Sequence, residues 1–176
     1  MKKNKLIIFI LLICLSINSF SQSKNIMGKP IPENIMNSKL YNIAGDSLVL
    51  STIIEENKGK VIYINFWASW CKTCRYEMPY SVKLDKKFSD NDVKFIYIST
   101  DEVYLAWIDA LNKVSNEGLN YKLDSAAKAE IKNYFNIKGI PYIIILDKNG
   151  NIAAKNAKYP SNVKSETQIT KILNIK

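Results

Sequence analysis

Residues 65–79 read NFWASWCKTCRYEMP, and they carry the clearest structural and chemical signals in this chain of 176 residues. The stretch begins inside Val61–Trp67, an apolar run rich in β-branched and aromatic residues, which predicts a strand buried on both faces. A helical pattern follows and continues to about Phe88. Cys71 therefore falls where the strand gives way to the helix, and Cys74 lies about one helical turn further on.

The position of Cys71 at the start of a helix favours a reactive thiolate. The unpaired N–H groups and the dipole of a helix N-terminus stabilise negative charge, and the thiolate is the form of cysteine that attacks a disulfide. Cys74 is expected on the same helix face but deeper in the protein, so it can attack a mixed disulfide formed by Cys71 and release the product. The spacing predicts that Cys71 attacks and that Cys74 resolves.

Two metal-binding uses of this cysteine pair conflict with the composition. Histidine is absent, and the only other cysteine is Cys14, so the ligands of a four-coordinate zinc site are missing. Covalent haem attachment needs histidine after the second cysteine, where this chain has Arg75. An inert buried pair and copper binding by the two thiols alone are alternatives that the residues leave open. We expect no metal site and no cofactor.

Further segments on either side of residues 65–79 have the composition of strands. They are 39–50, which holds two short strands around Gly45-Asp46, then 94–99 (KFIYIS), 142–146 (YIIIL) and 152–154. The dipeptide Asn149-Gly150 lies between the last two and is a strong hairpin signal. Residues 23–37 are polar, contain two prolines and are expected to be extended.

Helical patterns alternate with these strands. Apolar residues at helical spacing predict a helix over 101–116, and Asp101 is expected to cap its start. Ser125 is expected to cap a shorter helix, and a last helix is expected over about 165–174. This alternation predicts an α/β fold with a central mixed sheet, helices on both faces and an N-terminal β-hairpin extension.

The first 21 residues have the pattern of a cleaved export signal. Three lysines within the first five residues precede an apolar run at 6–15, and Ser19 and Ser21 form the small-x-small pattern of a cleavage site. Ten apolar residues are too few to span a bilayer, although a retained membrane anchor is the alternative. We expect cleavage after Ser21, loss of Cys14 with the signal, and a single domain over 22–176.

Export changes the role that we expect for the cysteine pair. Outside the cytoplasm, thiols are not kept reduced by default. A disulfide between Cys71 and Cys74 would close a very small loop, so its entropic contribution to stability would be small. Redox chemistry therefore explains the pair better than a structural cross-link does.

The charge balance is basic but does not indicate a nucleic-acid partner. The chain has 25 Lys and Arg against 16 Asp and Glu, a formal net charge of +9. Arg75 is the only arginine, whereas proteins that read nucleic acids depend heavily on arginine. A basic surface does favour the approach of acidic partners.

Residues 65–79 resemble the active-site segment of thioredoxin-fold proteins. Their W-C-x-x-C-x-x-E-x-P form is most similar to the exported TlpA/ResA-like branch of that family. The segment Gly139-Ile140-Pro141-Tyr142 resembles the family's loop that carries a cis proline opposite the cysteine pair. The resemblance covers about 28–176 in the order of its elements and implies a thioredoxin-like fold.

The resemblance implies roles for residues beside the two cysteines. Pro141 would be cis and would face Cys71, and Trp70 and Ile140 would shape the surface that binds substrate. A cis proline leaves neighbouring backbone open to an extended substrate strand. Glu77 would take or give the proton that disulfide exchange requires, and a solvated helix glutamate is the alternative.

The resemblance also implies a function. The protein would be an exported, periplasmic thiol–disulfide oxidoreductase, a monomer that acts as a reductant through a mixed disulfide. Its substrates would be oxidised exported proteins, including those of cytochrome c maturation, and a membrane thiol electron donor would re-reduce it. A disulfide oxidase or isomerase and a redox-inactive binding module are the alternatives.

Overall fold

Strand β3 (Val61–Trp67) is buried along its whole length in the computed structural model, which describes residues 26–88, 90, 92–114 and 118–174. It pairs in parallel with β4 (Val93–Ser99) and antiparallel with β6 (Tyr142–Leu146). Neighbours on both edges and helices over both faces explain why its sequence is an unbroken apolar run.

The sheet has seven strands in the order β2-β1-β5-β4-β3-β6-β7 among the described residues. The strands not yet located are β1 (Lys39–Tyr41), β2 (Ser47–Val49), β5 (Leu119–Leu123) and β7 (Ile152–Lys155). β1 and β2 form the expected hairpin, which joins the sheet at β5. β4 and β5 are parallel, and β6 and β7 are antiparallel. The predicted mixed sheet and N-terminal hairpin are confirmed.

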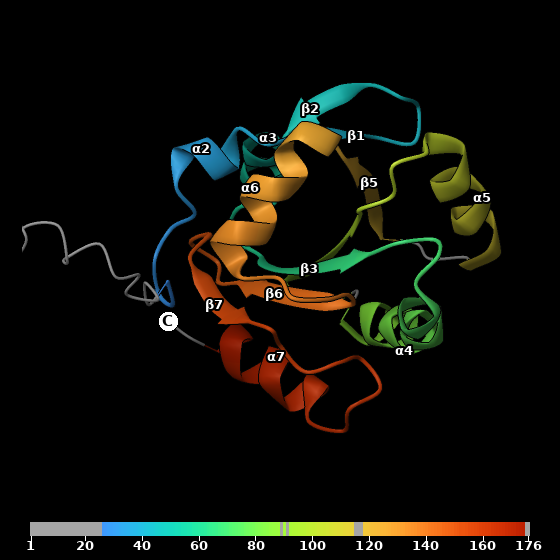
Figure 1. Ribbon diagram of the computed structural model, residues 1–176. Helices are drawn as coiled ribbons and strands as arrows, with labels where there is room; N and C mark the ends of the chain where they lie inside the picture. The colour runs from blue at the N-terminus through green and yellow to red at the C-terminus, as the bar shows by residue number, and fades with distance from the viewer. Residues whose placement is uncertain (1–25, 89, 91, 115–117, 175–176) are drawn as a thin grey trace, which may run out of the picture.

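Helices cover both faces of this sheet (Figure 1). The first face is covered by α2 (Glu33–Met36), α3 (Leu50–Glu56) and α6 (Ser125–Phe135). The second face is covered by α4 (Lys72–Phe88), α5 (Tyr104–Val114) and α7 (Ser165–Leu173). Each face has its own apolar core. Successive side chains of β3 point to opposite faces, so the strand contributes to both cores. Ile62 and Ile64 contribute to the first core, and Tyr63 and Trp67 to the second.

Two predictions of helix caps are wrong. Helix α5 begins at Tyr104, so Asp101 does not cap it. The cap of α6 is Asp124, whose side chain accepts the N–H of Ala126, rather than Ser125. Asp101 accepts hydrogen bonds from Ser69 and Ser99 instead, and at α6 two adjacent polar residues compete for one cap.

Three elements are absent from the prediction. Short helix α2 lies within the segment expected to be extended, and α3 follows the hairpin directly. β5 carries Asn120 and Lys122, so its sequence lacks the apolar run that marks a buried strand. The predicted signal, its cleavage site and Cys14 lie outside the described residues. No helix in the described part of the chain is long and apolar enough to cross a membrane.

Candidate active site

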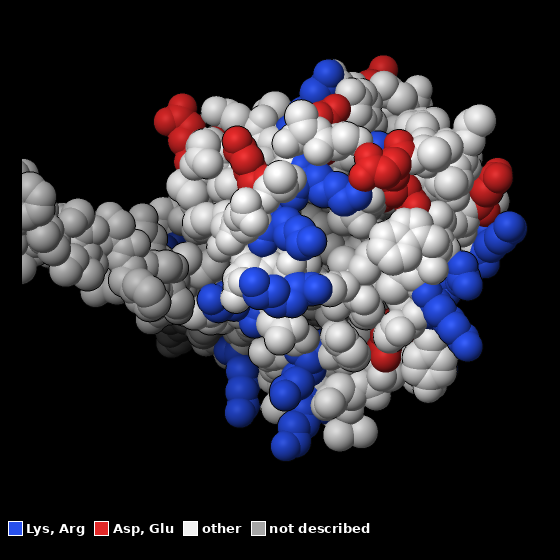
Figure 2. Space-filling model, viewed as in Figure 1, with Lys and Arg blue, Asp and Glu red and all other residues white. Residues whose placement is uncertain are grey.

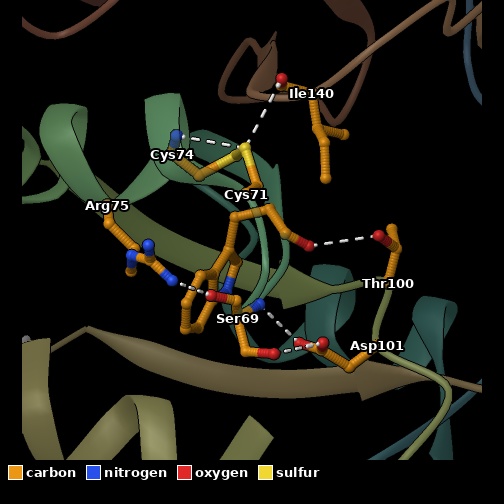
Figure 3. Close-up of a disulfide and its surroundings, with 8 residues drawn as sticks. Ser69, Cys71, Cys74, Arg75, Thr100, Asp101 and Ile140 are labelled. Carbon is orange, nitrogen blue, oxygen red and sulfur yellow. Dashed lines mark hydrogen bonds between the residues drawn. A yellow bond between two sulfur atoms is a disulfide. The ribbon is translucent and has the colours of Figure 1, made fainter. Parts of the chain in front are cut away.

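The two cysteines of the motif form a disulfide at the start of α4 (Figure 3). Cys71 immediately precedes the helix, and its Sγ accepts the backbone N–H of Cys74 at 3.1 Å. The sulfur thus occupies the place of an N-cap oxygen, where an unpaired N–H of the first helical turn meets it. In the dithiol form, this donor and the helix dipole would stabilise a thiolate on Cys71.

The proline loop lies directly against this sulfur. The peptide bond between Ile140 and Pro141 is cis, and the carbonyl oxygen of Ile140 lies 3.6 Å from Cys71 Sγ. The expected cis bond and its position opposite Cys71 are confirmed. The roles of Ile140, Pro141 and Trp70 in binding substrate stay predictions.

A buried carboxylate fixes the loop that leads into Cys71. Asp101 is only 3% exposed. Its Oδ2 accepts the N–H of Ser69 at 2.8 Å, and its Oδ1 accepts the hydroxyl of Ser69 at 2.6 Å (Figure 3). The hydroxyl of Ser99 donates to the same carboxylate at 2.7 Å. The segment that follows β4 is therefore bound to Ser69, which lies two positions before Cys71.

Three further hydrogen bonds hold this loop. The guanidinium of Arg75 donates to the carbonyl of Ser69 at 2.6 Å. The backbone N–H and hydroxyl of Thr100 both donate to the carbonyl of Trp67, at 2.8 and 3.2 Å. Sequence reasoning missed this use of Asp101. The available signal was its place at the carboxyl end of a strand parallel to β3, the edge where functional groups gather in α/β sheets.

Glu77 is buried on the second face, only 4% exposed. Its two carboxylate oxygens accept the N–H and the hydroxyl of Ser161, at 2.9 and 2.8 Å. The alternative of a solvated helix glutamate is therefore wrong. Cys74 is also buried, and it lies three residues earlier on the same helix, so the two side chains share one helix face.

Unsatisfied polar groups accompany Glu77 on this face. The hydroxyl of Tyr63 and the side-chain oxygen of Asn65 are buried and have no hydrogen-bond partner. Burial raises the pKa of Tyr63 well above its ordinary value, and the charges of Tyr97 and Glu77 raise it further. The polar surroundings of the cysteine pair thus extend inward, between α4 and β3.

The surface beside the cysteines is hollowed. Trp70 is 66% exposed, and together with Ile140 it borders a cavity of about 510 Å³. A second cavity, of about 390 Å³, shares Ile140 with the first and includes Pro141 in its lining. No cluster of acidic and cysteine side chains in the described part of the chain could hold a metal ion.

Comparison with known families gives the class of protein. The sequence model of a family described as Thioredoxin-like matches residues 59–152, a region that includes the cysteine pair, Asp101 and the proline loop. The chain belongs to this thioredoxin-like family. The fold and the disulfide at the start of α4 agree with that assignment.

Relatives and solved structures refine the class. The thiol-disulfide oxidoreductase ResA of Bacillus cereus is 28% identical over 165 residues, with 88% of this chain and 89% of that protein covered. ResA of Bacillus anthracis is 29% identical over 162 residues, covering 86% and 87%.

A crystal structure described as a thiol-disulfide oxidoreductase from Bacteroides vulgatus has a TM-score of 0.71 and 30% identity, covering 85% of this chain and 99% of that one. A thiol:disulfide interchange protein from Bacteroides sp. has a TM-score of 0.65 and 26% identity, covering 78% and 86%. The present protein is accordingly a thiol–disulfide oxidoreductase with a thioredoxin-like fold.

Proposed function

We propose that the protein is an exported reductant, which passes two electrons from the dithiol of Cys71 and Cys74 to disulfides of other exported proteins. The observation that carries the exchange chemistry is the capping contact between Cys71 Sγ and the N–H of Cys74. It supplies a preformed site for a thiolate at the sulfur that lies against the proline loop. The reducing direction is supported by the similarity to ResA proteins over most of both chains.

The reaction proceeds in two exchanges. The Cys71 thiolate attacks one sulfur of the substrate disulfide, the substrate S–S bond breaks, and the other substrate sulfur leaves as a thiolate. Cys74, once deprotonated, then attacks the Cys71 sulfur of the mixed disulfide and releases the second substrate thiolate. The protein ends with the Cys71–Cys74 disulfide, and the substrate has gained two electrons. Cys71 is 7% exposed and Cys74 only 2%, which fits these roles.

Glu77 accepts the proton that Cys74 must lose before it attacks. Its place one turn beyond Cys74, on the buried side of α4, supports this role. The two hydrogen bonds from Ser161 hold the carboxylate in place. General acid–base groups act best when they are positioned in this way, close to the group whose proton they move.

The cellular setting follows from the export pattern at the N-terminus. Residues 1–21 would be removed, and 22–176 would act as a monomeric domain in the periplasm. The substrates are oxidised exported proteins, including those of cytochrome c maturation, and a membrane thiol donor returns the protein to its dithiol form. Trp70, Ile140 and Pro141 form the surface that receives the substrate.

Single-cysteine variants test the order of attack. Cys71→Ser removes the attacking sulfur, so the reduction of a model protein disulfide such as that of insulin should fall at least about 1,000-fold. Cys74→Ser keeps the first exchange and removes the second, so mixed disulfides should accumulate and be detected by non-reducing electrophoresis and mass spectrometry. A Cys71→Ser protein that still reduces insulin would refute the mechanism. An unmodified protein without any turnover would favour the binding-module alternative.

A further inference from the structure

We infer that this oxidoreductase selects substrates whose cysteine is flanked by acidic residues and by a large apolar side chain. The inference rests on the proposed function and specifies its substrate. Three features carry it: an apolar cavity beside Cys71, lysines around that cavity, and the lack of carboxylates in its lining. The occupant is an extended polypeptide segment that binds across the proline loop.

The cavity of about 510 Å³ has an apolar floor. Phe66, Leu123, Ile131 and Ile137 line it, and all four are buried side chains. Its volume is within the range that encloses small ligands, so it can accept one large apolar side chain of a substrate. The exposed indole of Trp70 forms part of its lining and provides further apolar surface near the solvent.

Lysines surround this cavity and its neighbour. Lys128, Lys132 and Lys138 line the first cavity, and Lys138 and Lys155 line the second, whereas neither lining contains Asp or Glu. Lys128 is paired with Glu102. Within the described part of the chain, Lys132 and Lys138 are exposed and form no ion pair. Figure 2 shows Lys and Arg side chains gathered in the middle of this face, with most acidic ones nearer its edges.

Ile140 connects the lysines to Cys71, because it lines the same cavities as the lysines and its carbonyl contacts the sulfur. Ile140 borders both cavities, and its carbonyl oxygen lies 3.6 Å from Cys71 Sγ. A substrate sulfur bonded to Cys71 therefore starts at the edge of the cavity. An extended chain advances about 3.4 Å per residue, so residues within a few positions of its cysteine can reach the lining that holds Lys132 and Lys138. Substrate carboxylates near these lysines are attracted to them, and substrate ammonium groups are repelled.

Matched peptide substrates test the inference. Two peptides share a leucine next to a single cysteine, which is blocked as a 2-hydroxyethyl disulfide. One peptide has glutamates around this pair and the other has lysines. The measurement is kcat/KM for reduction by the purified full chain in its dithiol form. We expect about tenfold preference for the acidic peptide at low salt, shrinking as salt screens the charges. Serine in place of the leucine should lower kcat/KM several-fold.

Charge-reversal variants test whether Lys132 and Lys138 cause the preference for the acidic peptide. The double variant Lys132→Glu with Lys138→Glu should invert the ratio, so that the lysine peptide becomes the better substrate. Lys60→Glu is the matched control, since Lys60 is exposed and precedes β3 at the end opposite to Cys71. It should retain the wild-type ratio.

Three outcomes would overturn the inference. They are equal kcat/KM for both peptides in the wild type, an unchanged ratio in the double variant, and an equally large change in Lys60→Glu. Neutral bis(2-hydroxyethyl) disulfide separates this failure from that of the proposed function. If the wild type reduces the neutral disulfide but does not discriminate between the peptides, only the substrate inference fails. If it reduces no disulfide at all, both fail.

Discussion

The two faces of the central sheet have different chemistry although they share the same strands. The first face, under α2, α3 and α6, is mainly aliphatic, and isoleucines such as Ile62 and Ile64 dominate its core. The second face, under α4, α5 and α7, contains large aromatic rings, both cysteines and the buried carboxylate of Glu77. One face supplies apolar packing, and the other holds the redox pair.

Buried polar atoms show the same contrast. In the described part of the chain, five residues have a buried side-chain nitrogen or oxygen without a hydrogen-bond partner: Ser38, Tyr63, Asn65, Trp67 and Trp107. Four of them, all except Ser38, lie on the second face. Tyr63, Trp67 and Trp107 belong to the second core, and Asn65 points the same way by strand alternation. Each such atom costs about 1–3 kcal/mol of desolvation. These unpaired polar atoms therefore lower the free energy of unfolding, and they do so on the face that carries the cysteine pair.

The largest effect on the second face is expected from Asp101→Asn. An amide cannot accept all the donors of Ser69 and Ser99, so the free energy of unfolding should fall by about 2–3 kcal/mol. The loop before Cys71 should also lose its fixed position. Urea unfolding measures the first effect, and the pH profile of thiolate absorbance in the reduced protein measures the second.

The control for Asp101→Asn is Ser99→Ala, which removes one donor to the carboxylate and the acceptor of the Asp101 N–H, and leaves the contacts with Ser69 intact. It should destabilise the protein less and leave the thiolate profile in place. A normal thiolate profile in Asp101→Asn would mean that Asp101 stabilises the fold without positioning Cys71.

A smaller effect on stability, but a specific effect on chemistry, is expected from Glu77→Gln. Glutamine keeps one acceptor for Ser161 and loses the charge, so unfolding should be easier by about 1–2 kcal/mol. The pH dependence of the disulfide exchange rate should shift, because the proposed proton acceptor for Cys74 is gone. Glu166→Gln on α7 is the control and should keep the wild-type profile. An unchanged profile in Glu77→Gln would remove Glu77 from the mechanism.

The smallest effect is expected on the first face, from Asp124→Ala at the start of α6. The pKa of Asp124 is lowered mainly by the N–H of Ala126 and also by the hydroxyl of Tyr41. Because the folded-state pKa is lowered, the stabilisation is present above the ordinary value of 3.8 and is lost as pH falls through the folded-state value. The variant should lose about 1 kcal/mol at neutral pH, and the difference should vanish in acid.

Reduction of a neutral disulfide by Asp124→Ala should match the wild type, since the cap lies on the face that does not carry the cysteines. Urea unfolding at several pH values and the exchange assay together provide the test. A loss of exchange activity without a loss of stability would contradict the division between the two faces.

The sequence predicted the central strands well, because their signals are local. Val61–Trp67 was located to the residue, and the hairpin between β6 and β7 followed from Asn149-Gly150. β5 was missed because Asn120 and Lys122 interrupt its apolar pattern, although both are buried in the folded protein. A strand at this place is stabilised by its neighbours β1 and β4, and a local pattern does not contain that information.

The active site also has parts that the sequence predicts and parts that it does not. The cysteine motif and the proline loop were found by their spacing and resemblance, and the structure brings them together. The partners of the acids were not predictable. Ser161 is 84 residues from Glu77, and Ser69 is 32 residues from Asp101. Only the folded chain joins these pairs, and an aspartate before a helix favours a capping role when its sequence is read alone.

The central claim is that the cysteine pair works as a reductant, and its reduction potential tests this most directly. The protein is equilibrated in thiol–disulfide buffers of defined ratio, and tryptophan fluorescence reports the redox state, since Trp70 adjoins Cys71 and is 66% exposed. We predict a potential close to that of thioredoxin, about −270 mV. A value near that of a strong oxidase, about −120 mV, would contradict the proposed direction and identify the protein as a disulfide donor.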